Sequence, residues 1–477
     1  MTFGKKAILA VFWNTFGNYI GFGISFISQL ILIRILFPQD FGIFALATSI
    51  FEIFSILTSW SFSVAVIQMP EEDDLFDTAF YLSMLNGIIL LILTLIISFS
   101  LNYYYPNIKE LPLVFIYIGL CRAVSYISAI YIAHLEKNLK YKSISISRSI
   151  ISVLSVFVAV ISAIFGFGIW ALVIRELISS FFNLIVFKVI SKWTFKWKYN
   201  QELAKRLLTF SSKVLLSRGL EGAFYKIDSF LLGLIGGINI LGYYSQSRYL
   251  ADISHALSAP GTAIAAVPVY SKLQNEPGKL KEASRLYNYF LIRIMIPVSL
   301  IFLLFSDQVV LFLFGEKWLS ASVPLKGLFL FPILVPVFEN LKALLYGIGR
   351  IGTVAKIRLL QILISIPLLI FGFKHFYVFG FSVGFMMSIL IGTIFIYFYS
   401  KRHSYFSFKE NILFPFIAGV STFLCVYFLK NHVCNCSGVM GFIGFAFLTI
   451  TLYGGILFLI ENKIMLENIK LIKRKII

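Results

Sequence analysis

The stretch LIRILFPQDFGIFALATSI, residues 32–50, ends one long apolar segment and begins another across a short turn. About two hundred residues later, LLGLIGGINILGYYSQSRYL, residues 231–250, repeats this arrangement, and Gly42 and Gly242 occupy equivalent places. Six apolar segments precede the second copy, so both copies run in the same direction. Parallel repeats of this kind favour two lobes related by an axis along the membrane normal, with alternating access between them.

Segments long enough to cross about 30 Å of hydrocarbon as helix recur along the whole chain. We place about fourteen, at 10–36, 42–66, 78–100, 112–134, 145–166, 168–188, 208–234, 240–267, 287–306, 320–346, 355–373, 377–399, 411–429 and 439–460. A chain that is 59% hydrophobic and 13% charged is not a soluble globule. We predict an all-α polytopic membrane protein, with two six-helix lobes related by a pseudo-two-fold axis and two further C-terminal helices.

Lysine and arginine are concentrated in every second loop. The predicted basic side carries groups such as Lys137, Lys140 and Lys142, or Arg350, Lys356 and Arg358. By the positive-inside rule this bias predicts a multi-pass protein of the plasma membrane with both termini in the cytoplasm. The net charge of +19 then reflects topology and contact with anionic lipid, and nucleic acid is not an expected partner. The first apolar segment is too long for a removable signal peptide.

The loops divide the chain into four parts. We predict an N-lobe at 1–190, a linker at 191–207, a C-lobe at 208–405 and a C-terminal part at 406–477 with spans 13 and 14. The linker, SKWTFKWKYNQELAKRL, is typical of an amphipathic segment on the inner leaflet. The interiors of spans 13 and 14 lack charge, with Lys430 and His432 expected in a loop. A groove for a polyprenyl tail and a peripheral stabilising pair both fit these spans.

Polar residues fall on single faces of four predicted spans. They are Asn14, Asn18 and Gln29 in span 1, Glu52 in span 2, Arg218, Glu221, Tyr225 and Asp228 in span 7, and Arg248, Asp252 and His255 in span 8. Charges inside a bilayer normally face a partner or a water-filled cavity. Both interpretations stay open here. Arg122 in span 4 fits either one, whereas Arg175, Glu176, Arg293 and Lys326 are expected to be helix-end or packing charges.

Motifs of catalysis are absent from the sequence, which has no phosphate-binding loop, HExxH motif or zinc-spaced Cys/His set. We predict that the protein is no enzyme and holds no cofactor or metal. Cys121 and Cys425 are expected to be packing residues inside spans. Cys434 and Cys436 are spaced for a soft metal or a local disulfide, although two unremarkable thiols are the simpler interpretation.

The opening stretch LIRILFPQDFGIFAL resembles the signature after the first span of oligosaccharide flippases in the polysaccharide transporter family. That family belongs to the multidrug/oligosaccharidyl-lipid/polysaccharide flippase superfamily. Further similar stretches follow in family order at 77–90, 136–152, 165–180, 224–251, 267–274 and 313–321. The resemblance is greatest to Wzx-like lipopolysaccharide and teichuronic-acid exporters, and it fades after about residue 400.

The resemblance implies a flippase for undecaprenyl-diphosphate-linked oligosaccharide, acting beside a polymerase and glycosyltransferases. It implies that cavity arginines hold the diphosphate, a role that falls by position on Arg218 and Arg248, with Arg122 as a further candidate. Lipid II flippases carry arginines in span 1, whereas this chain has Asn14, Asn18 and Gln29 there, which disfavours lipid II. Coupling to H⁺ or Na⁺ would use Glu52, Glu221, Asp228 or Asp252. Tyr225 and His255 complete the expected binding face.

Three other functions fit the sequence less well than a flippase for lipid-linked oligosaccharide. A drug or metabolite antiporter of the same superfamily would need a smaller and more apolar cavity. A membrane polymerase or ligase would need a large extracytoplasmic loop, and all loops here are short. A membrane scaffold that transports nothing would leave the aligned charges of four spans without a purpose.

Overall fold

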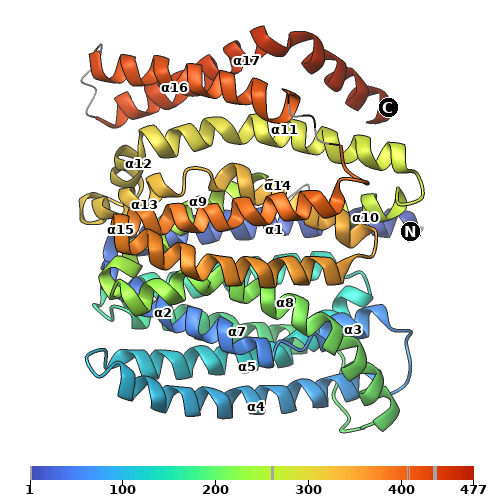
Figure 1. The fold of residues 1–477 in the computed structure, drawn as a ribbon. Helices are drawn as coiled ribbons and strands as arrows, with labels where there is room; N and C mark the ends of the chain where they lie inside the picture. Colours follow the sequence, from blue (N-terminus) through green and yellow to red (C-terminus); the bar gives the residue numbers. More distant parts are fainter. Residues whose placement is uncertain (1–2, 259–262, 406, 408, 433–437, 477) are drawn as a thin grey trace. The chain divides into compact units, whose positions relative to one another are not determined.

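A computed structural model describes residues 3–258, 263–405, 407, 409–432 and 438–476. Contacts divide the chain into two compact units, Met1–Gly242 and Tyr243–Ile477. The helices of unit 1 are α1 (Phe3–Ile35), α2 (Pro38–Phe54), η1 (Ser55–Leu57), α3 (Phe62–Gln68), α4 (Leu75–Tyr104), α5 (Glu110–Lys137), α6 (Tyr141–Ile164), α7 (Trp170–Ser191) and α8 (Gln201–Ile235). Within this unit, α4 lies along α5 (Figure 1), and α1 packs against α6.

Unit 2 continues from α9 (Ile238–Ser258), whose first residues still belong to unit 1. It contains α10 (Ala263–Lys272), α11 (Pro277–Leu304), α12 (Ser306–Leu313), η2 (Glu316–Ala321), α13 (Ser322–Gly327), α14 (Phe331–Gly347), α15 (Ile351–Ser400), η3 (Lys409–Leu413), α16 (Phe414–His432) and α17 (Val439–Ile476). The helix α15 is two helices joined at Phe376 and Tyr377, where the backbone is not helical. In Figure 1, α16 lies beside α17, and both contact α11.

The structure confirms an all-α polytopic membrane protein. Each of the fourteen predicted segments falls on one helix, one half of α15 or two to three consecutive helical elements. Among the described residues, nine helices are long and apolar enough to cross a membrane, or up to ten if a bent pair counts as one span. That pair, Glu316–Gly327 with Phe331–Gly347, is bent by 52°. The exact number of crossings therefore stays a prediction.

The turn at residues 36–38 is built by its own sequence. Pro38 begins α2, where a missing backbone N–H costs nothing, and the Asp40 carboxylate accepts the Phe37 N–H at 2.9 Å. One turn later, a Cβ on Gly42 would overlap the carbonyl oxygen of Ile238. A Cβ on Gly242 would likewise overlap the carbonyl oxygen of Pro38. The two repeated glycines thus allow the first turns of α2 and α9 to meet backbone to backbone.

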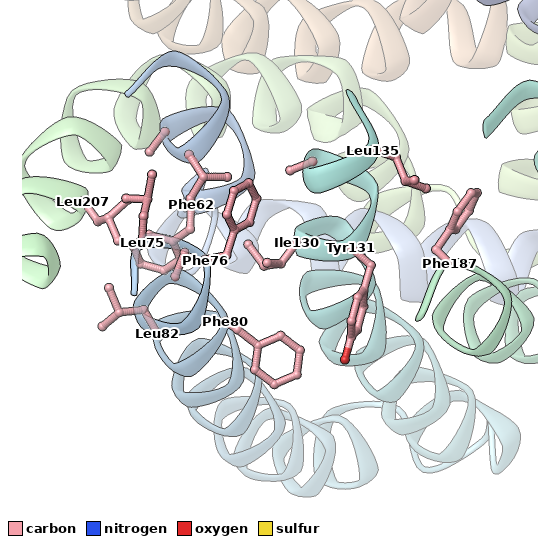
Figure 2. Packing of buried hydrophobic residues seen from close by; sticks show 14 of the residues in the cluster. Phe62, Leu75, Phe76, Phe80, Leu82, Ile130, Tyr131, Leu135, Phe187 and Leu207 are labelled. Carbon is pink, nitrogen blue, oxygen red and sulfur yellow. The ribbon is translucent and has the colours of Figure 1, made fainter. Parts of the chain in front are cut away.

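The largest described core of unit 1 joins the ends of α3, α4, α5, α7 and α8. Figure 2 shows its aromatic members Phe62, Phe76, Phe80, Tyr131 and Phe187 on facing helices. The chain between α7 and α8 packs against this core through two further side chains, Trp193 and Phe195. Each large apolar side chain that packs in this way contributes about 1.5–3 kcal/mol on burial. This end of unit 1 is therefore held by ordinary hydrophobic packing.

Residues 192–200 carry no helix, and α8 begins at Gln201, where the Asn200 side chain accepts the N–H groups of Glu202 and Leu203. The predicted linker therefore lies inside unit 1. Its Trp193 and Phe195 turn into the core, whereas Trp197 is 71% exposed. The division of the chain into two six-helix lobes stays a prediction, since contacts group α8 with unit 1.

The acidic loop at 71–77, which departs from the basic pattern, pairs with this linker. The Asp77 carboxylate accepts the Lys196 backbone N–H at 2.6 Å, and Asp74 lies 3.3 Å from the Lys198 ammonium group. Glu72 and Arg206 approach to 2.9 Å. The acidic residues are thus local counter-charges to a basic segment.

One expectation about the C-terminal part is wrong. Lys430 and His432 lie in the last turn of α16 rather than in a loop, and Lys430 donates to the Leu304 carbonyl at 2.7 Å. Glu461 lies just past the predicted end of span 14, where α17 leaves helical geometry, and its side chain is fully buried. The charged side chains Lys430 and Glu461 therefore lie near the ends of the predicted spans and pack against the protein there. The helix interiors remain apolar.

Candidate functional site

Four charged side chains inside the helices of unit 1 form two loose pairs. Arg122 of α5 approaches Glu52 of α2 to 3.5 Å, and Arg175 approaches its neighbour Glu176 in α7 to 3.8 Å. Cys121 interacts electrostatically with both Arg122 and Glu176, which places the pairs in one region. We name these four residues, Glu52, Arg122, Arg175 and Glu176, the charge cluster of unit 1.

Access to this cluster decides what it can do. The four side chains are between 22% and 43% exposed. Arg175 and Glu176 lie in the second turn of α7, whereas Arg122 lies near the middle of α5, a helix long and apolar enough to cross a membrane. A charge facing lipid at such a depth costs about 2.5–3.5 kcal/mol on insertion scales. The exposed surface is therefore best accounted for by a water-filled space. Loose, half-open pairs can exchange their partners for an incoming ion.

Two further helices contribute to the same region. The Gln29 side chain of α1 is 9% exposed and accepts a hydrogen bond from Arg175 at 3.4 Å. A Cβ on Gly222 of α8 would lie 3.5 Å from a Glu52 carboxylate oxygen. The structure thus brings the predicted residues Gln29, Glu52 and Arg122 together. It adds Arg175, which the sequence had suggested to be a packing charge.

The remaining predicted face of α1 is divided. Asn18 is exposed, whereas Gln29 is buried and bound by Arg175. The Asn14 side chain lies outside the described residues. A Cβ on Gly17 would overlap the Ser145 side chain, so α1 and α6 approach closely there. The predicted face of α1 thus includes both buried and exposed residues.

The predicted face of α8 also holds residues of different kinds. Arg218 is exposed, Glu221 and Tyr225 are half-buried, and Asp228 is fully buried. The Asp228 carboxylate accepts the N–H of Ser229 at 2.6 Å. Over ten residues of α8, the face therefore changes from the exposed Arg218 to the buried Asp228. The role of each as a substrate or ion ligand stays a prediction.

In unit 2, Arg248 of α9 is enclosed by aromatic rings. Its guanidinium carbon lies 4.1 Å from the centroid of Phe331 and 4.8 Å from that of Phe385, and Asp252 approaches to 3.4 Å. Stacking of this kind stabilises a desolvated arginine by about 2 kcal/mol. Asp252 itself is 49% exposed. The His255 side chain, the third member predicted on this face, lies outside the described residues.

A second buried network of unit 2 was not predicted. Arg358 of α15, expected in a loop, lies inside the helix and is only 2% exposed. It donates to Glu339 of α14 at 3.1 Å and to Gln361 at 3.0 Å, and Lys342 also pairs with Glu339. The signal was present in the sequence: Glu339 and Lys342, and then Arg358 and Gln361, are spaced three apart in consecutive spans.

A third network fastens α17 to α11. Arg293 donates to both oxygens of Glu461, at 2.6 and 2.9 Å, and Tyr289 donates to the same carboxylate at 3.0 Å. Arg285 pairs with Glu410 at 2.9 Å and with Asn468 at 2.8 Å. Arg293 had been expected to be a packing charge, and its tight enclosure agrees with a structural role.

Groups that could hold a metal are not found among the described residues. Cys121 and Cys425 are free cysteines, the first buried and the second exposed. Cys434 and Cys436 lie outside the described residues, so the choice between two unremarkable thiols, a soft-metal site and a local disulfide is not tested.

The chain belongs to the polysaccharide biosynthesis protein family, whose model matches residues 31–323, more than half of its length. It is 21% identical to the lipopolysaccharide biosynthesis protein WzxC of Escherichia coli, over 90% of this chain and 88% of that protein. It is 23% identical to the teichuronic acid biosynthesis protein TuaB of Bacillus subtilis, over 62% of each chain. These matches confirm the resemblance to Wzx-like polysaccharide transporters.

The fold is similar to a solved structure of the lipid II flippase MurJ in an inward closed conformation. The TM-score is 0.68 at 13% identity, and the match covers 94% of this chain and 99% of that one. At this identity the similarity shows the fold alone. It agrees with a multi-pass helical membrane protein.

Proposed function

We propose that this protein carries polyprenyl-diphosphate-linked oligosaccharide from the inner to the outer leaflet of the plasma membrane by alternating access. The observation that carries the proposal is the charge cluster of unit 1. Four helices bring two arginines, two carboxylates and Gln29 together, and the four charged side chains keep part of their surface accessible. A diphosphate headgroup matches guanidinium groups in charge and hydrogen-bond geometry.

Family membership supports the same substrate class. WzxC and TuaB are named for the biosynthesis of lipopolysaccharide and teichuronic acid, both of which contain sugar. The absence of catalytic motifs from the sequence fits a transporter rather than an enzyme. Placing both termini in the cytoplasm rests on the positive-inside bias of the loops.

The membrane potential can drive the loaded step. A diphosphate carries about two negative charges, and outward movement through an inside-negative potential releases about 2.3 kcal/mol per charge for each 100 mV. An incoming phosphate would displace Glu52 from Arg122, because both bind the same guanidinium. The displaced carboxylate is then available to a cation during the return step, as are Glu221, Asp228 and Asp252.

The test is to delete the gene and follow lipid-linked sugars in each leaflet. The proposal expects them to accumulate on the inner leaflet and to reach the outer leaflet again when the intact chain is restored. Normal outward transfer without the chain would contradict it. Restored efflux of small drugs without any effect on lipid-linked sugars would favour the antiporter alternative.

A further inference from the structure

A hollow of about 310 Å³ opens at one end of unit 2. Lys281, Glu282 and Arg285 from the first turns of α11 line it, together with Tyr405 from the segment that follows α15. The apolar part of α11 begins within about a turn of these residues. The hollow therefore opens where the polar headgroups of a bilayer meet its hydrocarbon.

Positive charge predominates around this hollow. Arg285 is held in place by Glu410 and Asn468, so its guanidinium is oriented in advance. Lys281, Arg350 and Arg402 all act on the neighbouring His403. Lys281 and Arg285 thus line the hollow beside one carboxylate, that of Glu282, and the positive charges of Arg350 and Arg402 add to the field at His403, two residues before Tyr405.

The pKa of His403 reflects the positive charge of its surroundings. Burial is the main reason that the pKa of His403 lies below its ordinary value, and the positive charges of Arg350, Lys281 and Arg402 lower it further. A neutral imidazole here leaves the surrounding cations without an added positive charge at neutral pH. Its Nδ1 has no hydrogen-bond partner among the described residues.

We infer that this hollow binds the phosphate of an anionic phospholipid headgroup. Lys281 supplies a mobile ammonium group, Arg285 a fixed guanidinium and Tyr405 a hydroxyl donor. Basic pockets between membrane helices on the cytoplasmic side are suited to such headgroups. Tyr405 is 48% exposed, and tyrosine is enriched at the membrane–water interface.

The carboxylate of Glu282 at the hollow favours a lipid phosphate over free inorganic phosphate. Glu282 lines the hollow, and its carboxylate repels any bound anion. That repulsion is smaller for a phosphodiester with one negative charge than for inorganic phosphate, which carries between one and two at neutral pH. The tail of the lipid also has the adjacent apolar helix surface to lie against. Both effects favour a lipid headgroup as the occupant.

The experiment uses the full-length chain in neutral detergent and counts bound lipids by native mass spectrometry. Phosphatidylglycerol is expected to bind more tightly than phosphatidylcholine. Lys281→Glu should weaken phosphatidylglycerol binding about tenfold or more, because each basic residue near a bilayer surface contributes roughly 1 kcal/mol and reversal adds repulsion.

Lys279→Glu is the matched control, because it reverses the same charge on the same helix. Lys279 does not line the hollow; its side chain is 64% exposed and pairs with Glu276. It should leave binding nearly unchanged. Tyr405→Phe, which alters no charge, should weaken binding about threefold through loss of one hydrogen bond. An equal loss in both lysine variants would overturn the site, as a diffuse surface charge would then explain binding. Displacement of the lipid by millimolar inorganic phosphate would overturn the choice of a lipid.

Discussion

One ion pair in each unit shows the contrast between an open and a closed pair of charges. In unit 1, Arg122 and Glu52 lie 3.5 Å apart and keep 43% and 29% of their side-chain surface. In unit 2, Arg293 and Glu461 lie 2.6 Å apart and keep 7% and none. Open pairs can exchange partners with a ligand at little cost, whereas closed pairs lose strong contacts when either partner leaves. The comparison separates charges that remain accessible from charges that hold helices together.

Breaking the closed pair has the largest expected effect. Arg293→Met leaves the Glu461 carboxylate buried without its main partner, which should destabilise the protein by about 3–5 kcal/mol. The double variant Arg293→Met with Glu461→Leu should recover most of that loss, because no charge is then left unpaired. Thermal unfolding in detergent measures both. A single variant as stable as the double one would contradict a structural role for the pair.

The pair of Arg293 and Glu461 also affects how a truncation of the C-terminal part, spans 13 and 14, must be interpreted. Truncation after residue 405 removes both Glu410 and Glu461, the carboxylates that pair with Arg285 and Arg293. We therefore expect truncation to unfold part of α11 rather than to test a lipid groove. Truncation combined with Arg285→Gln and Arg293→Met avoids leaving buried charges. Export by that variant would show that spans 13 and 14 are dispensable.

Removing the open arginine should affect transport without affecting stability. Arg122→Ala should lower export about tenfold or more, because a charge-assisted hydrogen bond to phosphate contributes roughly 1.5–3 kcal/mol. Arg122→Lys should restore it in part, since an ammonium group lacks the two-pronged geometry of a guanidinium. Transfer of lipid-linked sugar is compared with the melting temperature of each variant. Unchanged export at normal expression would remove Arg122 from the binding site.

Arg248 should fall between the two cases. Arg248→Ala loses contact with the rings of Phe331 and Phe385, so it should destabilise the protein by about 2 kcal/mol and also reduce export. Arg218→Ala, which alters an exposed residue, should reduce export alone. The pair of variants is read by melting temperature and by export together. A stability loss in Arg218→Ala but none in Arg248→Ala would reverse the assignment.

The smallest effect is expected where charge pairs lie at the protein surface. Arg206→Ala removes the partner of Glu72 and should change the unfolding free energy by only about 0.5 kcal/mol, an effect that high salt should abolish. Lys205→Ala, at the exposed neighbouring position, is the control. Melting temperatures at low and high salt check the prediction. A salt-independent loss would indicate that Arg206 acts through packing.

The sequence determined much of this protein by itself. Inside hydrocarbon every backbone group must be bonded within its own segment, so long apolar stretches had to become helices. The turn LFPQDFG was also readable, because proline, a capping acid and glycine act over a few residues, and its later echo shares the glycine. Family membership followed from the order of such stretches, and residues 31–323 match the family model.

Only the tertiary structure decided which charges meet. Helical spacing places residues on one face of one helix, and it carries no information about the helix opposite. Glu52 and Arg122 are 70 positions apart, and Arg293 and Glu461 are 168 apart. Arg175 and Arg293 had therefore looked alike as packing charges, although one lines an accessible cluster and the other closes a buried pair. The difference comes from the neighbours that folding supplies, because these set how much water each charge keeps.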